Sequence, residues 1–292
     1  MKSHDGPERK RKELIVYDAI IIGGGPAGLQ AALTLGRMHR RTLLLDSGEY
    51  RNSTVRHAHN LLTNDGRDPA ELRRIARAEI AAYDTVESRD AVATDIAPGD
   101  GGLRVVVDGE EHSAHAVIIA TGVSDELPPI PGLAEHWGDT VANCPFCHGH
   151  EFAGRPVAVV NGSDHATALA RMLEPVASEV HVVDPATVRE VAGVSGGLRL
   201  LLDDGSALEV AGAFVAPTWR PRGDLLERIG VQRQDSGAVR TDPFGRTSVE
   251  GVYAVGDIAQ PDHLPGPLFS LAAAIAGGQL AAVAVVQSLV AR

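Results

Sequence analysis

Positive charge, aromatic residues and long hydrophobic runs are all scarce in this 292-residue chain. The formal net charge of −11 argues against a nucleic-acid partner, because phosphate binding needs clustered cations. No apolar run reaches the roughly 18 residues of a membrane span. The nearest, Leu271 to Val290, is interrupted by Gly277-Gly278-Gln279 and by Gln287-Ser288, and it fits a buried helix better. We therefore expect neither nucleic acid nor a membrane as a partner.

The N-terminal segment lacks the features of an export signal. Residues 1–12 are polar and basic, and no apolar h-region follows them. We expect residues 1–13 to form a flexible basic tail, in which Arg9-Lys10-Arg11-Lys12 is at most a weak localisation signal. The expected compartment is the cytoplasm, where isolated thiols stay reduced unless they have a catalytic cycle.

Cysteine is also scarce, and the two cysteines form one motif, Cys144-Pro145-Phe146-Cys147-His148. A chain that keeps two thiols as a C-x-x-C pair favours a redox function. C-x-x-C-H is also a haem-attachment pattern, but that attachment follows export. Zinc could use His148 and His150 as well, although three of the four ligands would then fall within five residues. Two ordinary core cysteines are the remaining alternative. We expect no metal site.

A first nucleotide site is predicted near the N-terminus. Residues 16–22 have the composition of a buried parallel strand, and Gly23-Gly24-Gly25-Pro26-Ala27-Gly28 follows them directly. An alanine- and leucine-rich helix over residues 29–36 and a strand over residues 42–45 come next, and that strand ends at Asp46. In such a loop the first glycine permits the tight turn, the second admits the pyrophosphate and the third allows close helix packing. Asp46 can accept hydrogen bonds from a ribose.

Two later motifs indicate which dinucleotide is bound. Residues 117–122 form a strand that ends in Ala120-Thr121-Gly122, and residues 251–257 form another that ends in Gly256-Asp257. Both resemble the paired motifs of FAD-dependent reductases with two dinucleotide folds. The order of the three motifs along the chain predicts FAD as the cofactor.

A second nucleotide fold is predicted in the middle of the chain, but its binding loop is degenerate. A strand over residues 156–160 is followed by Asn161-Gly162-Ser163-Asp164-His165, which keeps one glycine. The next strand ends in Asp184-Pro185, where NADPH-dependent relatives carry cations for the 2′-phosphate. We expect this domain to have lost nicotinamide binding and to serve as the scaffold of the cysteines.

With these motifs in place, the chain resembles the low-molecular-weight thioredoxin reductase family over nearly its whole length. It looks most similar to dithiol oxidases of natural-product pathways, the gliotoxin and holomycin type, because the second cysteine is followed by His148 rather than Asp. The motifs that carry this resemblance are Asp46-Ser47-Gly48-Glu49-Tyr50-Arg51-Asn52, His57-Ala58-His59-Asn60, Cys144-Pro145-Phe146-Cys147-His148-Gly149-His150-Glu151 and Leu264-Pro265-Gly266-Pro267.

The resemblance implies an α/β fold with two Rossmann-like dinucleotide-binding domains, the second inserted into the first. It assigns residues 14–126 and 242–292 to an FAD-binding domain, and residues 127–241 to a degenerate NADPH-type domain that carries the C-x-x-C motif. It also implies a homodimer. The residues that it assigns to FAD are Gly23, Gly25, Pro26, Ala27, Gly28, Asp46, Ser47, Arg51, Asn52, His59, Asn60, Ala120, Thr121, Gly122, Gly256 and Asp257.

The implied reaction is the oxidation of a small-molecule dithiol, with oxygen as acceptor and hydrogen peroxide as product. Cys147 would lie against the flavin, and Cys144 would be attacked by a substrate thiolate. His148 is the first candidate for the base, with His150, His57 and His59 as weaker ones. Phe146, Trp137 and Phe269 could wall the substrate site, although core packing is the plainer expectation for each.

Two other functions stay open at this point. One is a disulfide reductase for a thioredoxin-like protein, which would use NADPH or another donor such as ferredoxin. The other is a non-catalytic redox sensor or scaffold that keeps FAD and a disulfide without turnover. The identity of the dithiol does not follow from the sequence.

Overall fold

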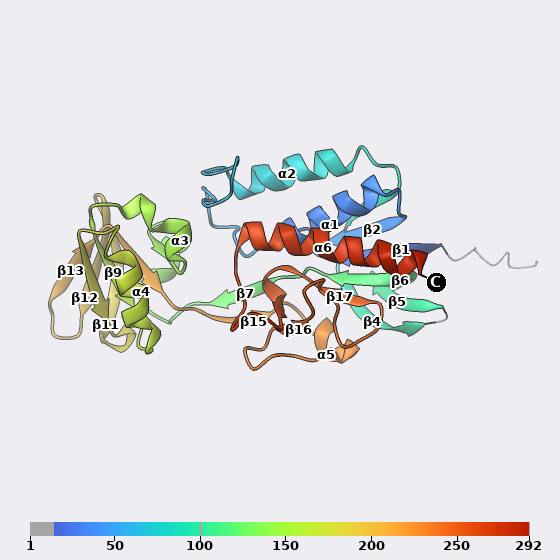
Figure 1. Ribbon diagram of the computed structural model, residues 1–292. Coiled ribbons are helices and arrows are strands. Elements are labelled where there is room, and N and C mark those ends of the chain that lie inside the picture. The colour runs from blue at the N-terminus through green and yellow to red at the C-terminus, as the bar shows by residue number, and fades with distance from the viewer. Residues whose placement is uncertain (1–14, 100, 292) are drawn as a thin grey trace, which may run out of the picture.

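The computed structural model describes residues 15–99 and 101–291, which form two lobes (Figure 1). The large lobe contains the N-terminal and C-terminal parts of the chain, and the small lobe contains the middle part. The predicted tail over residues 1–13 lies outside the described residues. The arrangement is the one expected for an α/β chain with one dinucleotide fold inserted into another.

A seven-stranded sheet in the order β3-β2-β1-β6-β5-β4, with β17 also paired to β6, forms the centre of the large lobe. β1, β2, β3, β6 and β17 run parallel, while β4 and β5 are antiparallel to their neighbours. The strands are β1 Val16–Ile22, β2 Thr42–Asp46, β3 Val86–Asp90, β4 Ala93–Gly99, β5 Gly102–Val107, β6 Glu110–Ile119 and β17 Val252–Ala254.

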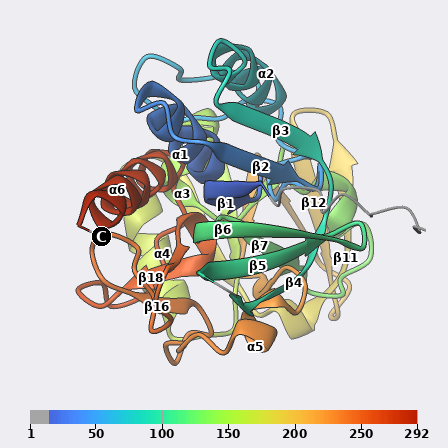
Figure 2. The ribbon, with the colours of Figure 1, turned by 90° about the vertical axis from the view of Figure 1, so that its right-hand side faces the viewer.

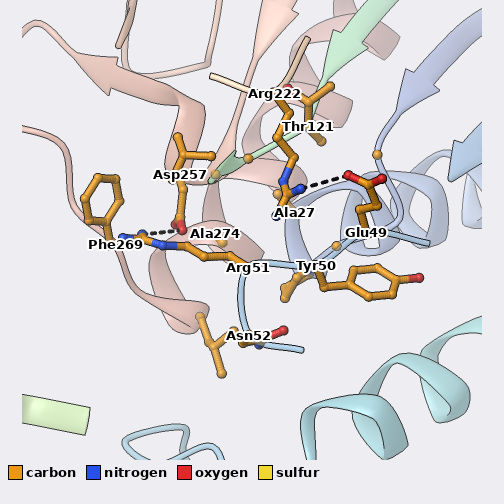
Figure 3. A pocket seen from close by; sticks show the side chains of 18 of the residues that line it. Ala27, Glu49, Tyr50, Arg51, Asn52, Thr121, Arg222, Asp257, Phe269 and Ala274 are labelled. Atoms are coloured by element: carbon orange, nitrogen blue, oxygen red, sulfur yellow. Dashed lines mark hydrogen bonds and ion pairs between the residues drawn. The ribbon is translucent and has the colours of Figure 1, made fainter. Parts of the chain in front are cut away.

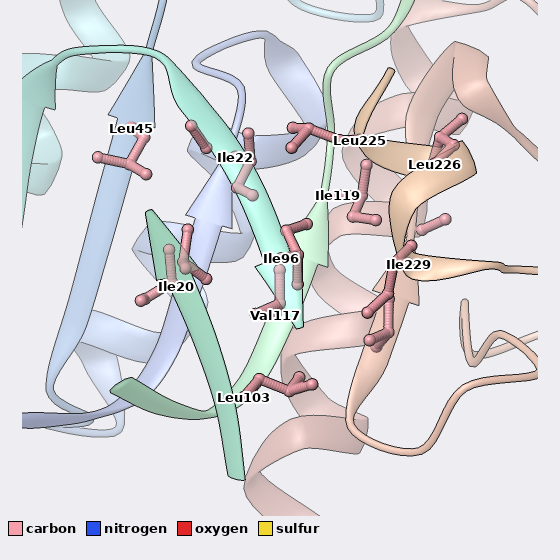
Figure 4. Close-up of a cluster of buried hydrophobic side chains, with 14 of the residues drawn as sticks. Ile20, Ile22, Leu45, Ile96, Leu103, Val117, Ile119, Leu225, Leu226 and Ile229 are labelled. Atoms are coloured by element: carbon pink, nitrogen blue, oxygen red, sulfur yellow. The ribbon is translucent and has the colours of Figure 1, made fainter. Parts of the chain in front are cut away.

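Both faces of this sheet are covered, which explains why β1 is a nearly continuous run of apolar residues. Figure 2 shows α1 (Pro26–Arg37), α2 (Pro69–Ile80) and α6 (Leu271–Val290) on one side, and α5 (Leu225–Ile229) on the other. Ile21 and Ile118 pack toward α1 and α6, whereas Ile20 and Val117 pack toward α5 (Figure 4).

The apolar C-terminal stretch forms α6, whose small residues pack against α1. By length and composition alone this helix could span a membrane, although 33% of its apolar window is buried inside the protein. Leu280 and Val290 are 41% and 71% exposed, so the expectation of a buried helix holds for one face only.

The small lobe has a parallel sheet in the order β10-β9-β14-β8 and an antiparallel sheet in the order β11-β12-β13. α4 and α3 accompany the parallel sheet, and α3 lies on the side that faces the large lobe (Figure 1). The elements are β8 Val141–Ala142, α3 Pro145–His148, β9 Pro156–Val160, α4 His165–Leu173, β10 Glu179–Val183, β11 Val188–Val194, β12 Gly197–Leu202, β13 Ala207–Val210 and β14 Gly212–Val215.

Two antiparallel strands, β7 (Val123–Glu126) and β15 (Thr218–Pro221), join the lobes. The chain returns to the large lobe earlier than the boundary at 242 expected from the sequence, because Leu225, Leu226 and Ile229 are buried in the core beside Ile20 (Figure 4). The remaining elements are β16 Val239–Thr241, β18 Ala259–Pro261 and the 3-10 turns η1 Leu133–His136, η2 His150–Phe152, η3 Pro185–Thr187 and η4 Gly256–Ile258.

Candidate active site

A cavity of about 750 Å³ lies at the edge of the large sheet where its parallel strands end, and it extends to α3 of the small lobe. The glycine loop follows β1, Asp46 ends β2, Ala120 follows β6 and Val255-Gly256 follow β17, so the parallel register places all of them at one edge. The site residues expected from the sequence line this cavity, with the exceptions of Gly28 and of the weaker candidate base His150.

The glycine loop forms a cradle for a dinucleotide. Gly23 has φ +117°, and a Cβ there would lie 2.3 Å from the Ala120 carbonyl oxygen. A Cβ on Gly28 would lie 1.9 Å from the Gly23 carbonyl oxygen, so this glycine acts by packing. Around Gly25, by contrast, no described atom lies within 4 Å of a Cβ, and the residue lines the cavity in front of α1. A pyrophosphate can therefore approach the backbone here and meet the N–H groups that begin the helix.

Thr121 provides a second indication of a polar ligand. Its hydroxyl oxygen is buried and has no hydrogen-bond partner among the described residues, although the residue lines the cavity. Buried polar groups in folded proteins are nearly always paired. An orphaned hydroxyl beside an open glycine cradle fits a dinucleotide such as FAD.

Asp46 is more constrained than its expected role as a ribose acceptor suggests. Its carboxylate accepts hydrogen bonds from the Tyr50 hydroxyl at 2.6 Å, from the Gly48 amide at 3.0 Å and from Arg77. Burial would raise the pKa of Asp46, but the bonds from Tyr50, Gly48 and Arg77 outweigh it and lower the pKa. Tyr50 and Arg77 were not predicted from the sequence as partners of Asp46.

Gly24 packs against Asp46, although the G-x-G-x-x-G motif allows any residue at its position. A Cβ on Gly24 would lie 1.9 Å from an Asp46 carboxylate oxygen. The loop and the acid therefore pack against each other without room for a methyl group.

Arg51 lies at the centre of an ion-pair network (Figure 3). It donates to Asp257 at 2.9 Å and, through two nitrogens, to Asp125 at 2.7 and 2.8 Å. The Phe269 ring covers its guanidinium at 4.1 Å. Burial would lower the pKa of Arg51, but its bonds to the carboxylates raise it. Burial raises the pKa of Asp257, and Arg51 partly offsets this. The sequence predicted both as cofactor contacts, but it did not predict this pairing or the part of Asp125.

The two cysteines are joined in a disulfide at the start of α3, with their Cα atoms 5.3 Å apart. Both line the cavity that contains the glycine cradle. In this state neither sulfur is available as a zinc ligand or for haem attachment, and within residues 15–99 and 101–291 no cluster of three potential metal ligands occurs. Phe146, which separates the cysteines, is 70% exposed, so it is not a core residue.

His148, the first candidate base, follows the disulfide directly and lines the cavity. Its Nδ1 atom is buried and finds no hydrogen-bond partner in the described part of the chain. Burial lowers the pKa of His148, so the neutral imidazole predominates near neutral pH and can accept a proton.

The other candidate histidines differ from His148 in their contacts and exposure. His59 lines the cavity but contacts Glu151 and Asp65. His57 lies 3.1 Å from the Gly66 carbonyl oxygen and is exposed, and His150 is exposed as well.

The second nucleotide loop presents carboxylates where a phosphate would bind. Asp164 stands directly before α4. Asp184 directly follows β10, accepts a hydrogen bond from the Ala186 amide at 2.9 Å, and lies 3.6 Å from the position of a Cβ on Gly162. The geometry thus places two negative charges at the loop and at the end of the following strand.

Comparison with known proteins places these features in a family. A family model described as pyridine nucleotide-disulphide oxidoreductase matches residues 17–187 and 180–287. Thioredoxin reductase tcpT of Claviceps purpurea is 34% identical, over 87% of this chain and 91% of its own. Thioredoxin reductase aclD of Aspergillus oryzae is 31% identical, over 94% and 96%.

Two solved structures are similar across both lobes. An oxidoreductase from Agrobacterium tumefaciens superposes with a TM-score of 0.85 at 35% identity, covering 94% of this chain and 99% of that one. HlmI superposes with a TM-score of 0.84 at 32% identity, covering 96% and 94%. The predicted fold class and the resemblance to thioredoxin reductases are confirmed.

The relatives bind FAD, and the residues of the glycine cradle fit it, so FAD is the cofactor of this chain. The glycine cradle that would hold FAD and the Cys144–Cys147 disulfide line the same cavity. With the family model matched over most of its length, the chain belongs to the pyridine nucleotide-disulphide oxidoreductase family.

Proposed function

We propose that this protein is an FAD-dependent oxidase that forms a disulfide in a small-molecule dithiol. The overall reaction would convert a dithiol and oxygen into a disulfide and hydrogen peroxide, with two electrons and two protons moving from sulfur to oxygen. The observation that carries the proposal is the pair of carboxylates at the second nucleotide loop, since it argues against NADPH as the source of electrons.

The electrostatic argument concerns the adenosine end of NADPH. Its 2′-phosphate would approach the end of β10, where Asp184 stands and where cations would be needed. The pyrophosphate would approach the start of α4, where the negative charge of Asp164 would repel it and already occupies the positive end of the helix dipole. If NADPH does not bind this lobe, the disulfide that the lobe carries is the entry point for electrons that the proposal assigns to the substrate dithiol.

The protein's own groups support that direction of transfer. A substrate thiolate attacks Cys144, the Cys144–Cys147 bond breaks, and Cys147 leaves as a thiolate. His148 takes the proton of the substrate's second thiol, whose sulfur then attacks the mixed disulfide and releases Cys144. When bound, FAD supplies the acceptor through which the electron pair passes to oxygen.

A second candidate is a thioredoxin reductase, and the names of the relatives tcpT and aclD favour it. That reaction runs in the opposite direction, from a nucleotide through the flavin to the disulfide and on to a protein. It requires an electron donor that can reduce the flavin although the small lobe lacks the usual glycine-rich loop for binding the phosphates of NADPH.

The test is to mix the oxidised holoenzyme without oxygen with either NADPH or dithiothreitol and to follow the flavin absorbance. We expect dithiothreitol to bleach the flavin and NADPH to leave it oxidised. On admission of oxygen, one peroxide should form for each dithiol consumed. Rapid bleaching by NADPH would support the reductase instead.

The matched control is Cys144→Ser, which should bind FAD normally and fail to bleach with dithiothreitol. Retained bleaching in that variant would mean that the thiol reduces the flavin without the cysteine pair, and the proposed route would be wrong.

A further inference from the structure

The wall of the cavity that contains the disulfide comes from the small lobe and carries no charge. Besides the two cysteines, its larger side chains are Trp137, Asn143, Phe146 and His148. Among the residues that the structure describes, this lobe contributes no Asp, Glu, Lys or Arg to the cavity. Burial lowers the pKa of His148, so its ring is also uncharged near neutral pH. A substrate that reaches the disulfide therefore meets a neutral surface on this side.

Phe146 gives this wall an apolar surface that the protein itself does not bury. The residue lines the cavity, yet it is 70% exposed. Leu268, from the large lobe, lines the same cavity and is 56% exposed. Large apolar side chains that are exposed at one cavity are typical of a ligand site. Only Pro145 separates Phe146 from Cys144, so a molecule whose sulfur bonds to Cys144 brings its other atoms near this ring.

The charged side chains that the large lobe contributes to the cavity all have partners of opposite charge. The pairs are Asp46 with Arg77, Glu49 with Arg222 at 3.0 Å, Asp224 with Arg228 at 2.7 Å, and Arg51 with Asp125 at 2.7 Å and with Asp257 at 2.9 Å. Within residues 15–99 and 101–291, no Lys or Arg at the cavity is left free to bind an anion. The carboxylates are paired as well, so an ammonium group would gain no free partner either.

The charge balance of the cavity disfavours an anionic substrate in particular. Arg51 serves two carboxylates, Asp125 and Asp257. Bound FAD would add the negative charge of its pyrophosphate to the same cavity. A carboxylate on the substrate would lose hydration on entry and would find no free cation in return.

We propose that the substrate dithiol is uncharged and carries an apolar group that packs on Phe146 while a substrate sulfur reaches Cys144. Phe146 is then a residue that determines specificity. The proposal rests on the proposed function, because it describes the substrate of that same reaction. It excludes thiols that bear carboxylates, such as glutathione and acidic peptides.

The first test uses three dithiols that share the same pair of thiols and differ only in their end group. Dihydrolipoamide ends in a neutral amide, dihydrolipoate in a carboxylate, and the 2-aminoethyl amide of dihydrolipoate in an ammonium group. The kcat/KM for peroxide formation by the native holoenzyme should be highest for dihydrolipoamide. We expect a margin of roughly tenfold, the size of effect that one charge has in a site of intermediate dielectric. A charged form that was oxidised as well as the amide would overturn the proposal.

The second test changes the apolar wall. Phe146→Ala should lower the ratio of kcat/KM for dihydrolipoamide to that for dithiothreitol by roughly tenfold, because dithiothreitol has hydroxyls in place of an apolar group. Phe146→Leu keeps apolar surface and should retain most of the ratio. The control is Met172→Ala, which changes a 53% exposed side chain of α4 that does not line the cavity, and it should leave the ratio unchanged. A ratio that did not change in Phe146→Ala would show that the ring does not contact the substrate.

A binding measurement separates this proposal from the proposed function. Calorimetric titration of the oxidised holoenzyme with the cyclic disulfides lipoamide and lipoate requires no turnover. Lipoamide should bind roughly tenfold more tightly than lipoate, and Phe146→Ala should weaken its binding. Equal binding of the two disulfides, or no measurable binding of lipoamide, would overturn the uncharged substrate even if dithiols are oxidised. Preferential binding of lipoamide without oxidation of any dithiol would overturn the proposed function alone.

A protein substrate is the alternative occupant of the apolar wall. Reduced thioredoxin is the probe for it, with flavin bleaching without oxygen as the measurement. If Phe146→Ala slowed bleaching by reduced thioredoxin and not by dihydrolipoamide, the ring would serve a protein surface, and the proposal would be wrong.

Discussion

At the scale of single residues, the glycines of the first loop have different tasks. Gly23 and Gly28 are required by the fold, because a side chain at either position would meet backbone atoms. Gly25 meets no described atom and has φ −77°, which any residue adopts. Its lack of a side chain therefore serves the ligand rather than the chain. Within one motif, Gly23 and Gly28 therefore serve stability, whereas Gly25 serves cofactor binding.

Gly25→Ala should accordingly weaken FAD binding without unfolding the protein. A methyl group where the pyrophosphate approaches should cost about 1–3 kcal/mol of binding, as overpacking does in cores. The dissociation constant would rise by roughly tenfold to a hundredfold. Fluorescence titration of the apoprotein measures it, and thermal unfolding of the apoprotein should be unchanged.

Gly23→Ala is the matched contrast, since it should fail to give a stably folded protein. Equal loss of stability in the two variants would contradict the assignment of Gly25 to the ligand.

The residues that the sequence could identify were those inside short motifs. The glycines of the first loop have a fixed spacing within their motif, and so do the cysteine pair and His148 within theirs. The structure brings the two motifs together at one cavity. The partners of Arg51 could not be predicted in this way. Asp125 and Asp257 lie 74 and 206 positions away along the chain, and only the strand order brings them together. The partners of Asp46 were missed for a related reason, because Arg77 comes from a helix whose placement depends on packing.

At the scale of elements, α6 approaches α1 so closely that one glycine is required. A Cβ on Gly278 would lie 2.0 Å from the Ala27 carbonyl oxygen in the first turn of α1. The same turn of α1 forms part of the glycine cradle, so the contact between α6 and α1 also helps to hold the cofactor site in place. The neighbouring Gly277 differs, since its Cβ would have no described atom closer than 3.8 Å.

Gly278→Ala should lower the free energy of unfolding by about 1–3 kcal/mol, because the two helices must move apart. FAD affinity should fall with it, since Ala27 lies in the cradle. Gly277→Ala should be neutral or stabilising by up to about 1 kcal/mol, because alanine is the better helix former. Urea unfolding of both variants gives the comparison. A destabilised Gly277→Ala would show that the helix tolerates no side chain on this face, and the close approach at Gly278 would lose its special role.

Elements with a continuous apolar run were predictable, and short amphipathic ones were not. β1, β2 and β9 were expected near their observed positions, because burial on both faces leaves a simple pattern. β3, β8 and β14, which belong to the same two sheets, were not predicted. α5 was assigned to the insert, yet it packs in the core of the large lobe. Five helical residues with buried leucines look the same whichever core they join, so the sequence could not decide between the lobes.

At the scale of the whole molecule, the chemistry depends on two lobes joined by only two strands. The glycine cradle belongs to the large lobe and the disulfide to the small one, and the cavity includes both. Asp125 lies on β7, one of the joining strands, and Arg51 bonds it to the large lobe beside Asp257. This network therefore fixes the joint between the lobes at the point where the cofactor cradle ends.

Arg51→Met should be strongly destabilising, because it leaves two partly buried carboxylates without their cation. The side chains of Asp125 and Asp257 are 7% and 22% exposed, and breaking such a pair costs about 3–5 kcal/mol. The matched control is Arg240→Met, whose salt bridge to Asp262 is exposed, so its loss should leave the free energy of unfolding nearly unchanged. Urea unfolding at neutral pH measures both.

The dependence of this loss on pH gives a second check. The pKa of Asp257 is already raised by burial, and removal of Arg51 raises it further. A group whose pKa is raised in the folded state costs most stability above that pKa and least below it. The difference between the native protein and Arg51→Met should therefore shrink as the pH falls from 8 toward 5. Hydrogen exchange should show faster opening of residues 123–126 in the variant at the higher pH, because β7 then loses its anchor. A loss of stability that stayed constant across this range would mean that the methionine disturbs packing against Phe269 and not the charge balance of the joint.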